Sequence, residues 1–128
     1  MKRLLFLSVL FTVCSFYSVF PQELRKIYLN KDDGLFTHPS RIAVFPGDSI
    51  QFVAVNGDFD ILLKTANEMF VTEDAEKKIR INSSSNPNSE ILILREQEIE
   101  LTRYYYQIYC ITNTSWPDAP PKIIIVSQ

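Results

Sequence analysis

The stretch of residues 41–64 constrains the fold of this chain more than any other part of the sequence. Residues 41–45 (Arg-Ile-Ala-Val-Phe) form an apolar run rich in β-branched side chains, which is typical of a strand. Pro46-Gly47-Asp48 then ends the run, because these residues fix or permit the backbone dihedrals of a tight turn. Residues 49–55 resume the apolar pattern, so we predict a second strand there.

A second turn is predicted at Asn56-Gly57, the pair that most readily adopts the positive φ angles of a two-residue hairpin. After it, residues 58–64 (Asp-Phe-Asp-Ile-Leu-Leu-Lys) show the period of two that indicates a half-buried strand. The stretch is therefore predicted to form a meander of three strands joined by two turns. Such a meander cannot bury its apolar face alone, so the rest of the chain must supply a second layer.

The remaining segments predict more strands and one helix. Residues 72–78 (Thr-Glu-Asp-Ala-Glu-Lys-Lys) begin with a capping residue, carry acids early and end basic, which favours a short helix. The pattern as a whole predicts an all-β fold, a Greek-key β-sandwich of seven or eight strands with one short helix. The further predicted strands are residues 24–29 at a sheet edge, 78–81, 91–94 buried on both faces, 104–111, and 122–126.

The strand predicted over residues 104–111 places Cys110 on its inward face. Alternation puts Cys110 in phase with Ile108, Tyr106 and Tyr104, whereas Gln107 marks the opposite face as the wetter one. In that position the thiol acts as a small apolar side chain.

The first twenty residues are predicted to be an export signal. Lys2 and Arg3 form a basic start, and residues 4–13 are mostly apolar. We therefore expect residues 1–20 to be removed, at a cleavage point that the pattern does not fix, and residues 21–128 to form a single β-sandwich domain. A retained signal anchor is the alternative. The domain is expected to be periplasmic or extracellular in a bacterium and secreted otherwise, with no stable membrane span after cleavage.

Charge and cysteine content argue against a nucleic-acid partner and against an intramolecular disulfide. The formal net charge is −2, and loss of Lys2 and Arg3 makes it more negative. No basic stripe is present, so we expect no nucleic-acid partner. Cys14 lies in the predicted signal, which leaves Cys110 alone in the domain and excludes an intramolecular disulfide.

Two segments together resemble the cupredoxin family. Residues 46–53 (Pro-Gly-Asp-Ser-Ile-Gln-Phe-Val) are similar to the P-G-D-x-aliphatic-x-aromatic strand entry of that family. Residues 104–110 (Tyr-Tyr-Tyr-Gln-Ile-Tyr-Cys), followed by a loop and a terminal strand, resemble its Tyr-rich strand that leads to a copper-ligating Cys. The resemblance implies a β-sandwich in which Cys110 holds the ligand position. An immunoglobulin-like sandwich is the rival, because it shares the P-G-D turn.

The chain departs from that family at most ligand positions. A blue-copper site needs two imidazoles and a thiolate, usually with a weak axial thioether. The family's first His falls near residues 58–60, and its second falls just past Cys110, at residues 111–114, yet neither segment contains His. Trp116 and prolines stand where the axial Met is expected. We therefore predict no cofactor, and name Cys110 and His38, the only histidine, as the candidate ligands if copper is bound.

No catalytic set is complete in the sequence, so we predict that the protein is not an enzyme. Cys110 and His38 are not supported by an elbow or oxyanion motif. Asp58 and Asp60 share one face of a strand, as expected for the wet side of a sheet.

The aromatic residues Tyr105, Tyr109 and Trp116 are candidates for an exposed platform that binds a protein or a glycan. The favoured function is an exported, non-catalytic binding or structural module without metal. The alternatives are a degenerate copper-binding or electron-transfer cupredoxin that uses Cys110, and an immunoglobulin-like adhesion or glycan-contacting domain. The oligomeric state does not follow from the sequence.

Overall fold

The computed structural model describes residues 22–96 and 101–126. The predicted export signal, residues 1–20, lies outside the described residues, so export and cleavage stay predictions. Within the described ranges, no helix combines the length and the apolar character that crossing a membrane requires.

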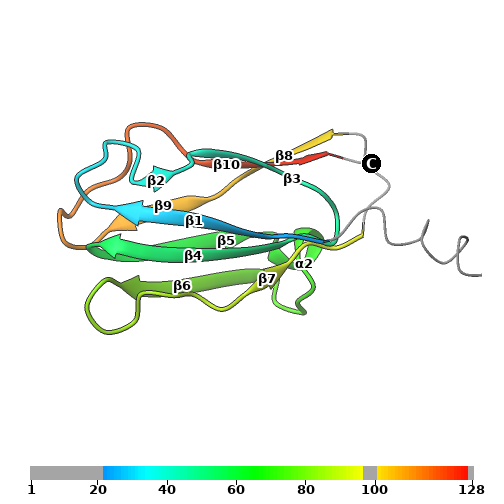
Figure 1. Cartoon of the computed structure of the whole chain (residues 1–128), viewed down its shortest axis with the longest axis horizontal. Helices are drawn as coiled ribbons and strands as arrows, with labels where there is room; N and C mark the ends of the chain where they lie inside the picture. Colours follow the sequence, from blue (N-terminus) through cyan, green and yellow to red (C-terminus); the bar gives the residue numbers. More distant parts are fainter. Residues whose placement is uncertain (1–21, 97–100, 127–128) are drawn as a thin grey trace, which may run out of the picture.

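The described residues form an all-β sandwich, which confirms the predicted fold class (Figure 1). One layer is a four-stranded sheet in the order β2-β1-β4-β7. The opposing layer holds two three-stranded sheets, β3-β10-β8 and β6-β5-β9, and the chain passes from β8 into β9 through Tyr106. The elements are β1 (Leu24–Asn30), β2 (Thr37–His38), β3 (Arg41–Val44), β4 (Ser49–Asn56), β5 (Asp58–Lys64), α2 (Ala66–Met69), β6 (Glu76–Asn82), β7 (Leu92–Ile93), β8 (Leu101–Tyr105), β9 (Gln107–Cys110) and β10 (Lys122–Val126).

The hairpin predicted at Asn56-Gly57 is wrong. β4 pairs in parallel with β1, whereas β5 pairs with β6 and β9 in the opposing layer. Gly57 has a φ of 117°, which lets the chain cross from one layer to the other. β3 also lies in the layer opposite β4, so residues 41–64 are not a meander. A tight turn reverses the chain direction without deciding whether the two strands pair or pack face to face.

The helix predicted over residues 72–78 is also wrong. The helix is α2, Ala66–Met69, and residues 76–78 belong to β6, which pairs with β5 along its whole length. Pairing with β5 lets β6 bury Ile79 and Ile81. This burial and the backbone ladder outweigh the weak helical preference of the charge order.

Three strands differ in detail from their predictions. β7 lies at a sheet edge, and Ile91 and Ile93 are 54% and 47% exposed, so this run is not buried on both faces. β1 is not an edge strand, because β4 pairs along its length and β2 pairs with its C-terminal part. The strand predicted over residues 104–111 is divided into β8 and β9 at Tyr106.

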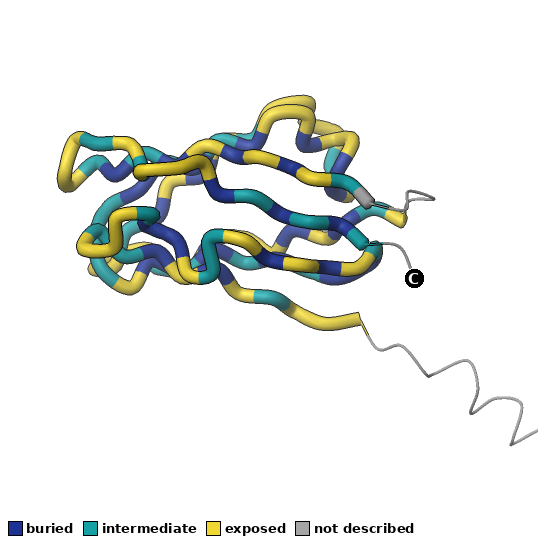
Figure 2. The backbone as a smooth tube through the Cα atoms, turned by 90° about the horizontal axis from the view of Figure 1, so that it is seen from above, coloured by how far each residue is buried: buried dark blue, intermediate teal, exposed yellow. Residues whose placement is uncertain are grey.

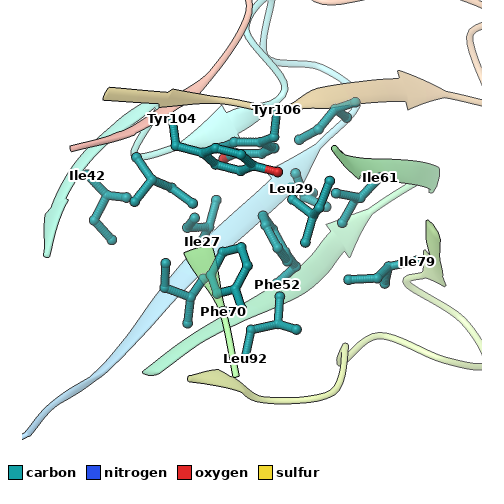
Figure 3. Close-up of a cluster of buried hydrophobic side chains, with 14 of the residues drawn as sticks. Ile27, Leu29, Ile42, Phe52, Ile61, Phe70, Ile79, Leu92, Tyr104 and Tyr106 are labelled. Atoms are coloured by element: carbon teal, nitrogen blue, oxygen red, sulfur yellow. The ribbon is translucent and has the colours of Figure 1, made fainter. Parts of the chain in front are cut away.

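Buried and more exposed residues alternate along the strands (Figure 2). The buried side chains of both layers form one cluster (Figure 3). Within it, Phe52 and Tyr106 pack edge to face with ring centroids 5.4 Å apart, and Phe70 and Tyr104 do so at 6.0 Å. These aromatic contacts join β4 and the segment after α2 to the opposing β8–β9 segment.

A buried carboxylate holds the turn between β3 and β4. Asp48 is only 4% exposed, and its two carboxylate oxygens accept hydrogen bonds from the backbone N–H groups of Glu23 and Phe45, each at 3.0 Å. The turn is therefore tied both to itself and to the residue that precedes β1. This explains why the Pro46-Gly47-Asp48 turn ends in an acid.

Replacing Asp48 with Ala is expected to lower the free energy of unfolding by about 2–3 kcal/mol, because two part-buried N–H groups lose their acceptor. Asp48→Asn, which keeps one acceptor oxygen, is expected to lose less. Urea unfolding monitored by circular dichroism measures both values. An Asp48→Ala variant as stable as the parent would contradict this account of the turn.

Candidate functional site

Cys110 ends β9 with its thiol in the core. The residue is fully buried and lies opposite Phe59 of β5 in the strand register. The inward phase predicted from alternation is therefore correct. The backbone of Cys110 exchanges two hydrogen bonds with that of Ser115, with N···O distances of 3.0 and 3.2 Å. The thiol thus packs as a small apolar group beneath a closed turn.

The turns beyond Cys110 are joined by hydrogen bonds to neighbouring turns. The N–H of Asp58 donates to Thr112 Oγ1 at 2.9 Å, and the N–H of Ile111 donates to the Asp58 carbonyl at 2.8 Å. Asn113 Nδ2 donates to the Lys31 carbonyl at 2.9 Å. The β1–β2 turn and the loop after β9 therefore meet at one end of the sandwich, on the left in Figure 1. We call this region the loop end.

An aromatic pair, the half-buried Tyr109 and the exposed Trp116, lies on the outer side of β9. The ring centroids of Tyr109 and Trp116 are 4.9 Å apart, and their planes are inclined by 59°. Tyr109 faces outward because its strand neighbours Ile108 and Cys110 face the core. Trp116 is 62% exposed, which is unusual for so large an aromatic side chain. The pair therefore presents an aromatic surface, mainly that of Trp116, to solvent.

Hollows flank Trp116 on two sides. The larger has a volume of about 360 Å³, and we call it the Trp116 groove. The smaller, of about 290 Å³, lies against the proline-rich loop. The Trp116 groove is lined by Trp116 with Asp60, Ile61, Leu62, Lys78, Gln107 and Tyr109, and the smaller hollow by Trp116 with Tyr106, Gln107, Ile108, Pro117, Pro120 and Pro121.

Strand pairing assembles the floor of the Trp116 groove. β5 lies between β6 and β9, so Leu62 has Lys78 as its partner on one side and Gln107 on the other. Residues paired in this way share one face of a sheet. This row of three paired residues therefore places the apolar side chain of Leu62 between the ammonium group of Lys78 and the amide of Gln107.

The adjacent row carries an ion pair. Arg80 donates to both carboxylate oxygens of Asp60, at 2.9 and 3.2 Å. Hydrogen bonding to Asp60 raises the pKa of Arg80. Asp60 is thus held by a cation, and both Asp58 and Asp60 lie on the half-exposed face expected for them.

The comparisons with known proteins concern the fold. No protein-family model matches the chain, and no curated protein sequence matches it. A reduced Cu(I) form of a proline-to-glycine mutant of amicyanin has a TM-score of 0.51 at 13% identity, covering 84% of this chain and 87% of that one. An oxidized methionine-to-lysine mutant of amicyanin has a TM-score of 0.50 at 15% identity, covering 78% and 79%. The fold is cupredoxin-like.

The residues at the ligand positions of this cupredoxin-like fold do not fit a blue-copper centre, which requires two imidazoles beside the thiolate. Asp58 and Thr112 stand where the imidazoles are expected, and the backbone N–H of Asp58 donates to Thr112 Oγ1. His38 is exposed on β2, in the layer opposite the strand that carries Cys110. Among the described residues, no group of three or more His, Cys, Asp or Glu side chains is arranged to hold a metal ion.

The structure brings Tyr109 and Trp116 together but leaves Tyr105 apart. Tyr105 is 53% exposed on β8, where Lys122 Nζ lies 5.9 Å from the centre of its ring, and it lines neither hollow. Sequence reasoning misses Lys78 as a groove residue, because its place depends on the register of β6 with β5. A strand prediction over residues 76–82, paired with residues 58–64, would have found it.

Proposed function

We propose that this protein is an exported, non-catalytic binding module that holds its ligand in the Trp116 groove. The observation that carries the proposal is the contact of Tyr109 with the exposed Trp116 beside a hollow of about 360 Å³. Aromatic rings offer a large contact area at low entropic cost, and sites of this volume suit small ligands or single subsites. Export is inferred from the basic, then apolar, start of the chain.

The positions of the reactive side chains support a binding role over a catalytic one. Cys110 is buried, while His38 is exposed in the other layer, so they do not form a nucleophile and base pair. Asp60 is held by Arg80. The side chains that do converge in the groove are mainly aromatic, apolar and amide groups, with Lys78 as the one cation of the lining.

Screening the purified protein against an array of glycans and peptides tests the proposal. Any ligand that binds is expected to lose about tenfold or more in affinity with Trp116→Ala, because the main stacking surface is removed. Tyr105→Ala is the matched control, since Tyr105 is an exposed aromatic outside the groove. The proposal fails if no ligand binds, or if binding survives Trp116→Ala and is lost with Tyr105→Ala.

A further inference from the structure

We propose that the Trp116 groove binds a sugar that carries a carboxylate, with the ring stacked on Trp116 and the carboxylate held by Lys78. This inference rests on the proposed binding function and adds the ligand class. It follows from the size, the surface chemistry and the free charge of the groove.

The size of the groove favours a small ring-shaped ligand over a protein surface. Its volume of about 360 Å³ is at the low end of the range for small-molecule sites. A stable protein interface buries roughly 800 Å² per partner. The groove is instead bordered by the Arg80–Asp60 ion pair, which limits the extent of its apolar surface.

The surface chemistry of the groove matches a saccharide. Trp116 and Leu62 present apolar surfaces on which the C–H face of a sugar ring packs. Gln107 is exposed on the same surface, and its amide both donates and accepts hydrogen bonds, as sugar hydroxyls require.

The free charge of the groove is positive. Asp60, the acid that lines it, is neutralised by Arg80 outside the lining. Lys78 is exposed and forms no ion pair within residues 22–96 and 101–126. Glu76, two residues along the same face of β6, does not line the groove. An anionic group on the ligand therefore complements Lys78.

An extended peptide is a poorer fit, because the edge of β9 that faces away from β5 already makes backbone hydrogen bonds at both of its ends. At one end, Cys110 exchanges backbone hydrogen bonds with Ser115, and at the other, the N–H of Tyr106 donates to the Pro121 carbonyl at 3.3 Å. Only residues 107–109 lie between these contacts, which is too little for a peptide to add as a strand.

Fluorescence of Trp116, the only tryptophan in the chain, reports binding directly. The probes are oligosaccharides of galacturonate and of glucuronate, sialyllactose, the methyl ester of each acid, and an acidic proline-rich peptide. At least one acidic sugar is expected to shift the fluorescence and to bind about threefold to fivefold more tightly than its ester, as for an exposed ion pair. Raised salt is expected to reduce this preference.

Two lysine variants identify the cation. Lys78→Gln is expected to abolish the preference for the acid over its ester, whereas Lys26→Gln, an exposed position on β1 in the other layer, is expected to keep it. The inference is overturned if no acidic sugar binds, if acid and ester bind equally, or if Lys78→Gln keeps the preference. If only the peptide binds, and Trp116→Ala abolishes that binding, the inference of a sugar ligand is overturned but the proposed binding function is supported. Failure of every probe and of the array overturns both.

Discussion

Replacing Cys110 with Asp is expected to leave the protein unfolded at neutral pH. Cys110 is fully buried against Phe59 in the core cluster, so the new carboxyl group would be desolvated without a partner. Burying an unpaired charge, or protonating the group to avoid it, costs several kcal/mol. The net stability of a domain is only about 5–15 kcal/mol. Far-UV circular dichroism and thermal melting measure the outcome.

Two controls separate burial from chemistry in this test. Cys110→Ala is expected to fold, with a loss of roughly 1–2 kcal/mol for a small cavity. Gln107→Asp introduces the same carboxylate on the exposed face of β9 and is expected to fold normally. A Cys110→Asp protein that melts cooperatively near the parent temperature, or a native thiol that reacts rapidly with a labelling reagent, would show that Cys110 is not in the core.

A loss of stability above about pH 10 is the second large effect expected, and it comes from Tyr106. Burial raises the pKa of Tyr104 to about 12 and that of Tyr106 further still. Tyrosines of the unfolded chain titrate near 10. Above that pH the unfolded state binds fewer protons than the folded state, so the free energy of unfolding falls as pH rises. The slope is up to about 1.4 kcal/mol per pH unit for Tyr106.

The matched variants Tyr106→Phe and Tyr104→Phe test this account. Tyr106→Phe is expected to flatten the alkaline decline and to cost nothing at pH 7, because the Tyr106 hydroxyl has no hydrogen-bond partner among the described residues. Tyr104→Phe is expected to lose about 1 kcal/mol at pH 7, because the Tyr104 hydroxyl donates to the Lys64 carbonyl. Urea unfolding at pH 7, 10 and 11 measures these values. An unchanged slope for Tyr106→Phe would contradict the role of its burial.

The local alternation of apolar and polar residues predicted most strands, but it did not predict which strands pair or which layer each belongs to. The inward phase of Cys110 follows from alternation alone, because burial repeats every two residues in a strand. The crossing between layers at Asn56-Gly57 does not follow from alternation. β4 and β5 each have one apolar face, and this pattern is compatible both with a hairpin and with two strands packed face to face. Residues 72–78 satisfy the charge order of a helix, and only pairing with distant β5 makes part of them a strand.

The same distinction applies to the candidate site. Tyr109 and Trp116 are recognisable as candidates because aromatic residues on the outer face of a strand and in a loop are unusual. Their partners Leu62 and Lys78 are ordinary residues that gain a role only through the register of three strands. A cupredoxin-like fold does not by itself imply copper chemistry, since function depends on the residues at the site.

The indole N–H resonance of Trp116 gives the most direct test of binding through the Trp116 groove. The chain has one tryptophan, so this signal is unique in a ¹H–¹⁵N correlation spectrum of the labelled protein. Titration with the best ligand from the array is expected to shift the indole signal and the backbone amides of Gln107 and Tyr109. An unmoved indole signal, with shifts confined to the loop-end residues Asn113 and Lys31, would contradict the account.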